Sequence, residues 1–261
     1  MARILLVEDN IINQKLVESM LERIGYKLDI AVNGREALGI LRDHQYDLIL
    51  MDIQMPEMDG YETTRIIRDP ASEVRDHNVT IIALTASVIE SEQGRCIDAG
   101  MNGFIAKPIN PDELRETVSR CLSGQAGGPD GFKVEMTKGT GQTPPVGDDE
   151  SKVLMLVKML ERIGGSMELA NRLLALYVKE IPAFVIKMRQ ALKEGNAPDV
   201  QLNAHSIKGA SANIGGELVR EKAQAIEMAA KEKDLARAEG LMADFAVEFD
   251  RLCQTIKARD A

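Results

Sequence analysis

The strongest constraint on the fold is a short apolar run that ends in an acid, within the stretch YDLILMDIQMPEMDG at 46–60. Asp47–Met51 is almost continuously apolar, which is the pattern of a strand buried on both faces of a parallel sheet. Asp52 follows this run directly, and Pro56 and Gly60 then predict a loop. Such a strand places Asp52 at the carboxyl edge of the sheet, where open α/β folds bind their ligands.

Other runs of strand length alternate with segments of helical apolar spacing over residues 1–123. Alternation of this kind predicts βα units with right-handed crossovers. We therefore expect an α/β doubly wound domain with a five-stranded parallel sheet and helices on both of its faces. The predicted strands are Arg3–Val7, Lys27–Ala31, Asp47–Met51, Thr80–Leu84 and Gly103–Ala106.

Polar side chains follow four of these strands, and the carboxyl ends of parallel strands share one edge. Clustered carboxylates repel unless a cation lies among them, and a set of oxygen ligands suits Mg²⁺. An acid nucleophile, a divalent metal and a lysine together are what phosphoryl transfer to a carboxylate requires. The alternative is a solvated group of ions at strand ends, which explains one such residue more easily than the whole set. The residues are Glu8, Asp9, Asp52, Thr85 and Lys107.

Four motifs of this region resemble the receiver domain of two-component signalling. They are VEDN at 7–10, MDIQMPEMDG at 51–60, ALTAS at 83–87 and FIAKP at 104–108. The resemblance covers residues 1–123 and implies a flavodoxin-like sheet with strand order 2-1-3-4-5. It also implies that Asp52 is the phosphate acceptor.

The same resemblance assigns further roles. Thr85 and Lys107 would contact the phosphoryl oxygens, and Phe104 would be the aromatic switch residue. Packing of Phe104 against the last strand is the alternative. The residues of the implied Mg²⁺ site are Glu8, Asp9, Asp52 and Gln54, the last through its backbone carbonyl.

Residues 124–150 have the composition of a flexible linker, with seven glycines, three prolines and no apolar periodicity. A flexible coil of this length spans roughly 30 Å r.m.s.. Local turns at Pro144–Pro145 are the alternative and would stiffen it. The sequence therefore predicts a domain at 1–123, a linker at 124–150 and a second domain at 151–261.

From Ser151 onward no β-rich segment occurs, and amphipathic segments with short connections predict a C-terminal all-α helical bundle. The predicted helices are Lys152–Ile163, Leu169–Ile181, Pro182–Leu192, Asp199–Ile214, Glu217–Glu232 and Leu235–Ile256.

The helix predicted over Asp199–Ile214 carries a histidine beside a lysine. His205, Lys208 and Gly209 share a stripe centred roughly 120° from the predicted buried stripe, so we expect the imidazole to face outward. A neutral histidine is a competent nucleophile toward phosphorus, and a lysine one turn away can balance phosphate charge. An ordinary surface or core histidine is the alternative. The predicted buried stripe is Val200, Ala204, Ile207, Ser211 and Ile214.

The string HSIKGASANIG at 205–215 resembles the histidine-containing phosphotransfer (HPt) domain. The resemblance extends over roughly residues 151–259. It implies that His205 is the phospho-accepting residue and that Lys208 is its charge partner. Ala210 departs from the pattern, because the family often has serine there.

Charge and composition exclude several other classes. Residues 1–123 hold 13 Lys and Arg against 21 Asp and Glu, which argues against binding to nucleic acid. No apolar run approaches the ~18 residues that suggest membrane insertion, and MARILLVEDN reaches acids too soon for a secretory signal. Three distant cysteines indicate neither a disulfide framework nor a zinc site. We expect a cytoplasmic protein.

The two resemblances together imply a phosphorelay intermediate and not an enzyme. A histidine kinase would load Asp52, and the group would pass through His205 to another receiver or HPt protein, or in reverse. No ATP-binding glycine-rich segment is visible. The EDN-with-NQ pattern at 8–14 is similar to receivers of hybrid kinases, so the C-terminal part of such a kinase is an alternative. Met1 directly before the first strand favours a free-standing protein.

Two alternatives come from other classes. An aspartate-nucleophile phosphatase of the haloacid dehalogenase type would carry a second acid where Gln54 stands, and it would have a cap domain. The helical half alone could be a docking or dimerisation module, in which case phosphotransfer would not need His205.

Overall fold

The structure is a computed structural model that describes residues 2–85, 90–123 and 154–259. The chain divides into two compact units, Met1–Thr140 and Gly141–Ala261. The boundary between these units, and the linker predicted at 124–150, lie outside the described residues.

The first unit contains the predicted sheet. Its five strands are all parallel, in the order β2-β1-β3-β4-β5. The predicted fold class and strand order are confirmed, and every strand end lies within one residue of its predicted position. The strands are β1 (Ile4–Val7), β2 (Leu28–Ala31), β3 (Leu48–Asp52), β4 (Thr80–Thr85) and β5 (Gly103–Ala106).

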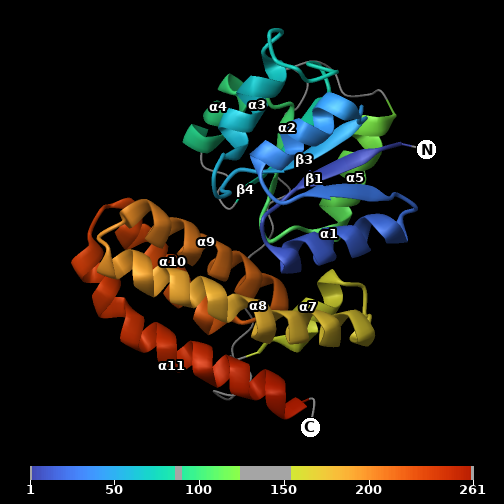
Figure 1. Cartoon of the computed structure of the whole chain (residues 1–261). Coiled ribbons are helices and arrows are strands. Elements are labelled where there is room, and N and C mark those ends of the chain that lie inside the picture. The colour runs from blue at the N-terminus through green and yellow to red at the C-terminus, as the bar shows by residue number, and fades with distance from the viewer. Residues whose placement is uncertain (1, 86–89, 124–153, 260–261) are drawn as a thin grey trace. The chain divides into compact units, whose positions relative to one another are not determined.

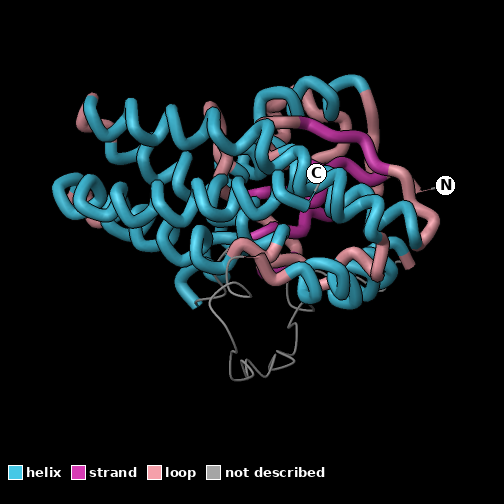
Figure 2. The backbone as a smooth tube through the Cα atoms, turned by 90° about the horizontal axis from the view of Figure 1, so that it is seen from below, coloured by secondary structure: helices cyan, strands magenta, loops and turns pink. Residues whose placement is uncertain are grey.

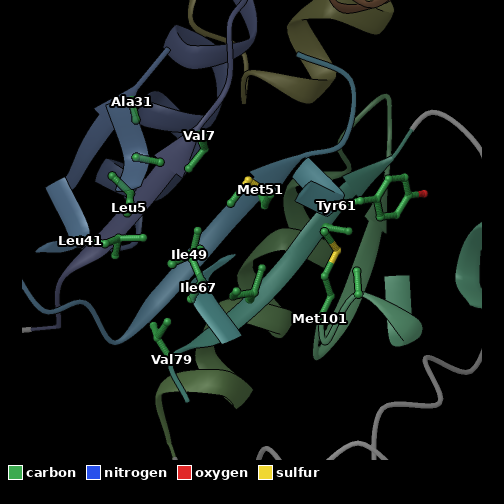
Figure 3. Packing of buried hydrophobic residues seen from close by; sticks show 14 of the residues in the cluster. Leu5, Val7, Ala31, Leu41, Ile49, Met51, Tyr61, Ile67, Val79 and Met101 are labelled. Carbon is green, nitrogen blue, oxygen red and sulfur yellow. The ribbon is translucent and has the colours of Figure 1, made fainter. Parts of the chain in front are cut away.

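Helices cover both faces of this sheet (Figure 1). Leu5 and Ile49 pack in one apolar cluster with Leu41 of α2 and Ile67 of α3, as Figure 3 shows. The alternate residues Leu6 and Leu50 are also fully buried, on the face of α1 and α5. Burial on both faces explains why the central strands β1, β3 and β4 are almost continuously apolar. The helices are α1 (Ile11–Arg23), α2 (Gly34–Asp43), α3 (Gly60–Arg68), α4 (Glu90–Asp98) and α5 (Pro111–Leu122).

A glycine positions the loop that follows β3. A Cβ on Gly60 would clash with the backbone oxygen of Asp52, so only glycine lets the start of α3 approach the strand this closely. Asp59 caps α3 by accepting a hydrogen bond of 2.7 Å from the backbone N–H of Glu62. The loop is thereby held against the residue that ends β3.

The second unit is a helical bundle, as predicted. Helix α9 packs against α8 and α10, and α11 packs against α10 and α8 (Figures 1 and 2). No helix in the part of the chain that the structure describes is long and apolar enough to span a membrane. The helices are α7 (Leu156–Arg162), α8 (Met167–Lys193), α9 (Ala197–Ile214), α10 (Glu217–Lys231) and α11 (Leu235–Arg259).

The prediction of separate helices at Leu169–Ile181 and Pro182–Leu192 is wrong. Both lie in the single helix α8, with Pro182 in its interior. An interior proline costs about 3 kcal/mol. The buried stripe of α8 continues past it through Ile181 and Val185, and this packing outweighs the local penalty.

Candidate functional site

Three acids and a lysine meet at the carboxyl edge of the sheet, as the sequence predicts. Glu8, Asp9 and Asp52, here called the acid cluster, each place one carboxylate oxygen within 4.8 Å of the others. The Nζ of Lys107 lies 2.7 Å from Glu8 Oε2 and 2.7 Å from Asp52 Oδ2. Glu8 and Asp52 are buried, with exposed fractions of 0% and 2%. One ammonium thus bridges two buried carboxylates.

Helix α1 holds Glu8 in place. Asn13 Nδ2 donates to Glu8 Oε1 at 2.7 Å, and Gln14 Nε2 donates to the backbone oxygen of Glu8 at 2.6 Å. Asn10 caps the same helix by accepting a hydrogen bond from Ile12 N. The NQ pattern in the sequence carries no signal for these roles of Asn13 and Gln14, because their contacts depend on the turn between β1 and α1.

Three other predicted site residues also lie in the receiver domain. The N–H of Gln54 donates to Asp52 Oδ1 over 3.4 Å, and its carbonyl as a metal ligand stays a prediction. Phe104 is half-buried against the apolar core, as its packing alternative expects, and its role as a switch stays a prediction. Thr85 ends β4, and its hydroxyl donates to Glu92 Oε2 of α4 at 3.0 Å.

The prediction that His205 faces outward is wrong. His205 is only 5% exposed, and its Nδ1 lies 2.8 Å from Glu227 Oε1 of α10. Lys208 Nζ lies 2.6 Å from the other oxygen of Glu227. The prediction treated α9 in isolation, whereas α10 packs against α9 and brings a carboxylate to the histidine. The predicted buried stripe of α9 is confirmed, since all five of its residues are fully buried.

Two family models match the chain. The family model of the response regulator receiver domain matches residues 4–119. The family model of the Hpt domain matches residues 172–259. The chain is a receiver domain joined to an Hpt domain.

Similar proteins include histidine kinases. Hybrid signal transduction histidine kinase K of Dictyostelium discoideum is 40% identical over 124 residues, which are 46% of this chain and 10% of that protein. Sensor histidine kinase GacS of Pseudomonas protegens is 31% identical over 237 residues, or 89% of this chain and 24% of that protein. The chain therefore spans a quarter or less of the length of these relatives.

The solved structures that are similar include the receiver domain of sensor histidine kinase PA1611 from Pseudomonas aeruginosa. It is 39% identical, with a TM-score of 0.43, and the match covers 47% of this chain and 98% of that one. That receiver domain was crystallised with a magnesium ion coordinated in its active site cleft.

Burial shapes the electrostatics of the receiver domain. Desolvation and the neighbouring Glu8 carboxylate raise the pKa of Asp52 well above its usual range, against the opposing effect of Lys107. Burial would lower the pKa of Lys107, but Asp52 and Glu8 outweigh it and raise that pKa. Lys107 therefore stays cationic, and one more cation beside Asp52 would favour its ionised form.

In the Hpt domain, Glu227 contacts two basic side chains at once, His205 and Lys208. Burial would raise the pKa of Glu227, but its contacts with His205 and Lys208 outweigh burial and lower it. An ionised carboxylate at Nδ1 favours the imidazole tautomer that carries its proton there, which leaves the lone pair on Nε2. The only sequence signal for Glu227 was an acid next to the apolar residues of α10, such as Ile226.

Replacing Glu227 with glutamine should lower the free energy of unfolding by about 1–3 kcal/mol at pH 7. The reason is that the amide offers one acceptor oxygen where His205 and Lys208 use two. The ionised Glu227 carboxylate makes its full contribution to the free energy of unfolding above the unfolded carboxyl pKa of ~4.3. This contribution is lost as pH falls through the lowered pKa of Glu227 in the folded state. Urea unfolding measures the difference in free energy of unfolding between wild type and Glu227→Gln, and this difference should shrink from pH 7 to pH 3. A difference that stays constant would contradict the role of Glu227 as the ionised partner of His205 and Lys208.

Proposed function

We propose that this chain is a phosphorelay intermediate, in which Asp52 takes a phosphoryl group from a histidine kinase and His205 exchanges it with another receiver. The observation that carries the proposal is the presence in one chain of two candidate phosphoryl acceptors, each with a charged side chain beside it. One is a buried aspartate bridged to Lys107, and the other is a histidine whose Nδ1 contacts Glu227. Each acceptor has a cation near it to balance phosphate charge.

At Asp52, a carboxylate oxygen would attack phosphorus as the bond to the donor's histidine nitrogen breaks. Lys107 would neutralise charge on the transferred group, since its Nζ already lies 2.7 Å from Asp52 Oδ2. For this step Thr85 would have to donate to a phosphoryl oxygen.

Mg²⁺ fits the acid cluster on charge and ligand type. The three carboxylates and the Lys107 ammonium, which contacts Glu8 and Asp52, together carry two negative charges when all are ionised. The available donors are hard oxygens. We propose that Glu8, Asp9, Asp52 and the carbonyl of Gln54 hold the ion. When bound, it would neutralise phosphoryl oxygens and favour ionised Asp52.

At His205, Nε2 would attack the phosphorus of an aspartyl phosphate. The phosphorus–oxygen bond breaks and its electron pair returns to the aspartate carboxylate. The imidazole keeps its proton on Nδ1 and becomes positively charged, and the Glu227 carboxylate 2.8 Å away stabilises that charge. Lys208, one turn further along α9, would balance the charge of the phosphoryl group.

Replacing Asp9 with alanine should abolish measurable Mg²⁺ binding and raise the free energy of unfolding by about 1 kcal/mol. The change removes a hard oxygen ligand and also relieves repulsion within the acid cluster. Calorimetric titration and urea unfolding measure the two effects. Glu73→Ala, which removes an exposed acid outside the cluster, is the control. Unchanged Mg²⁺ affinity in Asp9→Ala would refute this ligand assignment.

The chemical stability of the phosphorylated protein tests the proposal as a whole. The protein is incubated with a radiolabelled phosphodonor and Mg²⁺, and the product is then treated with acid or base. Acyl phosphate is labile in base and phosphohistidine is labile in acid, so both kinds of label should be found. Label that resists both treatments would mean a hydroxyl ester and would overturn the proposal.

A second candidate keeps the same chemistry within a larger protein. The match to GacS covers 89% of this chain, and it favours a role as part of a hybrid histidine kinase. The phosphodonor would then be a kinase domain of the same polypeptide. We propose a cytoplasmic location in either case, with a kinase and another receiver or Hpt protein as partners.

A further inference from the structure

The hydroxyl of Thr85, which is proposed to donate to the phosphoryl group, donates instead to a carboxylate of α4 in this structure. Thr85 is 4% exposed, and its Oγ1 donates to Glu92 Oε2 over 3.0 Å. It also lies close to the acid cluster, because Leu84 pairs with Asp52 in the sheet and the N–H of Lys107 donates to the carbonyl of Thr85. The hydroxyl therefore lies beside the phosphorylation site while it is bonded to a carboxylate of α4.

The described contacts of α4 differ between its two ends. Toward its C-terminal end, Cys96 is buried and the guanidinium carbon of Arg95 lies 4.4 Å from the ring centroid of Tyr61. Closer to its N-terminal end, the hydrogen bond from Thr85 to Glu92 ties α4 to β4. This hydrogen bond depends on Thr85, whose hydroxyl would donate to the phosphoryl group once Asp52 is phosphorylated.

One hydroxyl proton cannot serve two acceptors at full strength. A phosphoryl group on Asp52 would compete with Glu92 for the Thr85 proton, and its charge of about −1.5 to −2 would repel the Glu92 carboxylate. Competition and repulsion act in the same direction. Both favour loss of the bond between Thr85 and Glu92 once Asp52 is phosphorylated.

We propose that Glu92 is a latch that holds Thr85 in the unphosphorylated conformation, and that phosphorylation of Asp52 opens it. The inference rests on the proposed function, because it takes Asp52 as the acceptor. Opening detaches the N-terminal part of α4 from β4. By linkage, a latch that favours the unphosphorylated state must weaken binding of a phosphoryl group.

Beryllofluoride with Mg²⁺, a stand-in for the phosphoryl group, tests the latch in the full chain. Titration followed by fluorine NMR should show about tenfold tighter binding for Glu92→Ala than for wild type, as expected when a competing bond to a charged acceptor is removed. Glu92→Gln keeps an acceptor without its charge and should give a smaller gain. Asp98→Ala removes an exposed acid from the same helix and should bind within twofold of wild type.

A double-mutant cycle shows whether Glu92 acts through Thr85. In a Thr85→Val background, Glu92→Ala should give no further gain, and a gain that persists would overturn the latch. Without beryllofluoride, amide exchange in the first turns of α4 should be at least threefold faster in Glu92→Ala. Unchanged exchange would also contradict the proposal.

The outcomes separate the latch from the proposed function. Beryllofluoride binding that is equal in wild type and Asp52→Ala would overturn Asp52 as the acceptor. Binding that requires Asp52 but is no tighter in Glu92→Ala would overturn the latch alone.

Discussion

Asp52→Ala abolishes phosphorylation of the receiver domain by acetyl phosphate and Mg²⁺, with label in residues 1–123 reduced at least a hundredfold. The substitution removes the nucleophilic carboxylate, and no other acid of the cluster ends the central strand β3. The fold is retained, because Lys107 keeps its contact of 2.7 Å with Glu8. Asp47→Ala removes an exposed acid from the opposite end of β3 and should label like wild type. Label in the receiver domain of Asp52→Ala would show that the acceptor is another residue.

The same variant reports on the raised pKa of Asp52. In the folded protein Asp52 holds its proton more tightly than in the unfolded chain, so its ionisation destabilises the fold as pH rises through the raised pKa. Asp52→Ala has no carboxyl group at this position, so its free energy of unfolding does not fall for this reason. Its stability relative to wild type should therefore increase from pH 3 to neutral pH in urea unfolding, and a difference independent of pH would contradict the raised pKa.

His205→Gln abolishes phosphorylation of the Hpt domain, with acid-labile label reduced at least a hundredfold. Glutamine can still donate a hydrogen bond toward Glu227, but it has no nitrogen lone pair able to attack phosphorus. Base-labile label on Asp52 should remain. His44→Gln changes an exposed histidine at the end of α2 and is the matched control. Transfer to a second receiver that survives in His205→Gln would instead support a docking or dimerisation role for the helical unit.

The receiver fold was predictable because its signals are local. The central strands β1, β3 and β4 are short apolar runs buried on both faces, so the run alone identifies each of them. Each acid or lysine that directly follows a strand is carried to one edge of the sheet by the parallel topology. The cluster around Asp52 and Lys107 is the result.

The predictions for Pro182 and His205 were wrong because packing against a second element determines the structure at both residues. Pro182 was expected to begin a helix, but packing on both sides of it keeps α8 continuous. His205 was expected at the surface, but α10 packs over it and supplies Glu227. Glu227 and Glu92 escaped prediction for the same reason, because each acts on a residue of another element. A single helix or strand carries no signal for such a contact.

The most direct test of the account follows one phosphoryl group from Asp52 to His205. The predicted linker at 124–150, treated as a ~30 Å coil, would give an effective concentration on the order of millimolar, so exchange within one molecule should dominate. The intact chain is loaded with label at Asp52 and the donor is removed. The base-labile and acid-labile fractions are then timed over a hundredfold range of protein concentration. We expect label to appear on His205 as it leaves Asp52, at a rate independent of protein concentration. Label that leaves Asp52 only as inorganic phosphate, with none on His205, would contradict it.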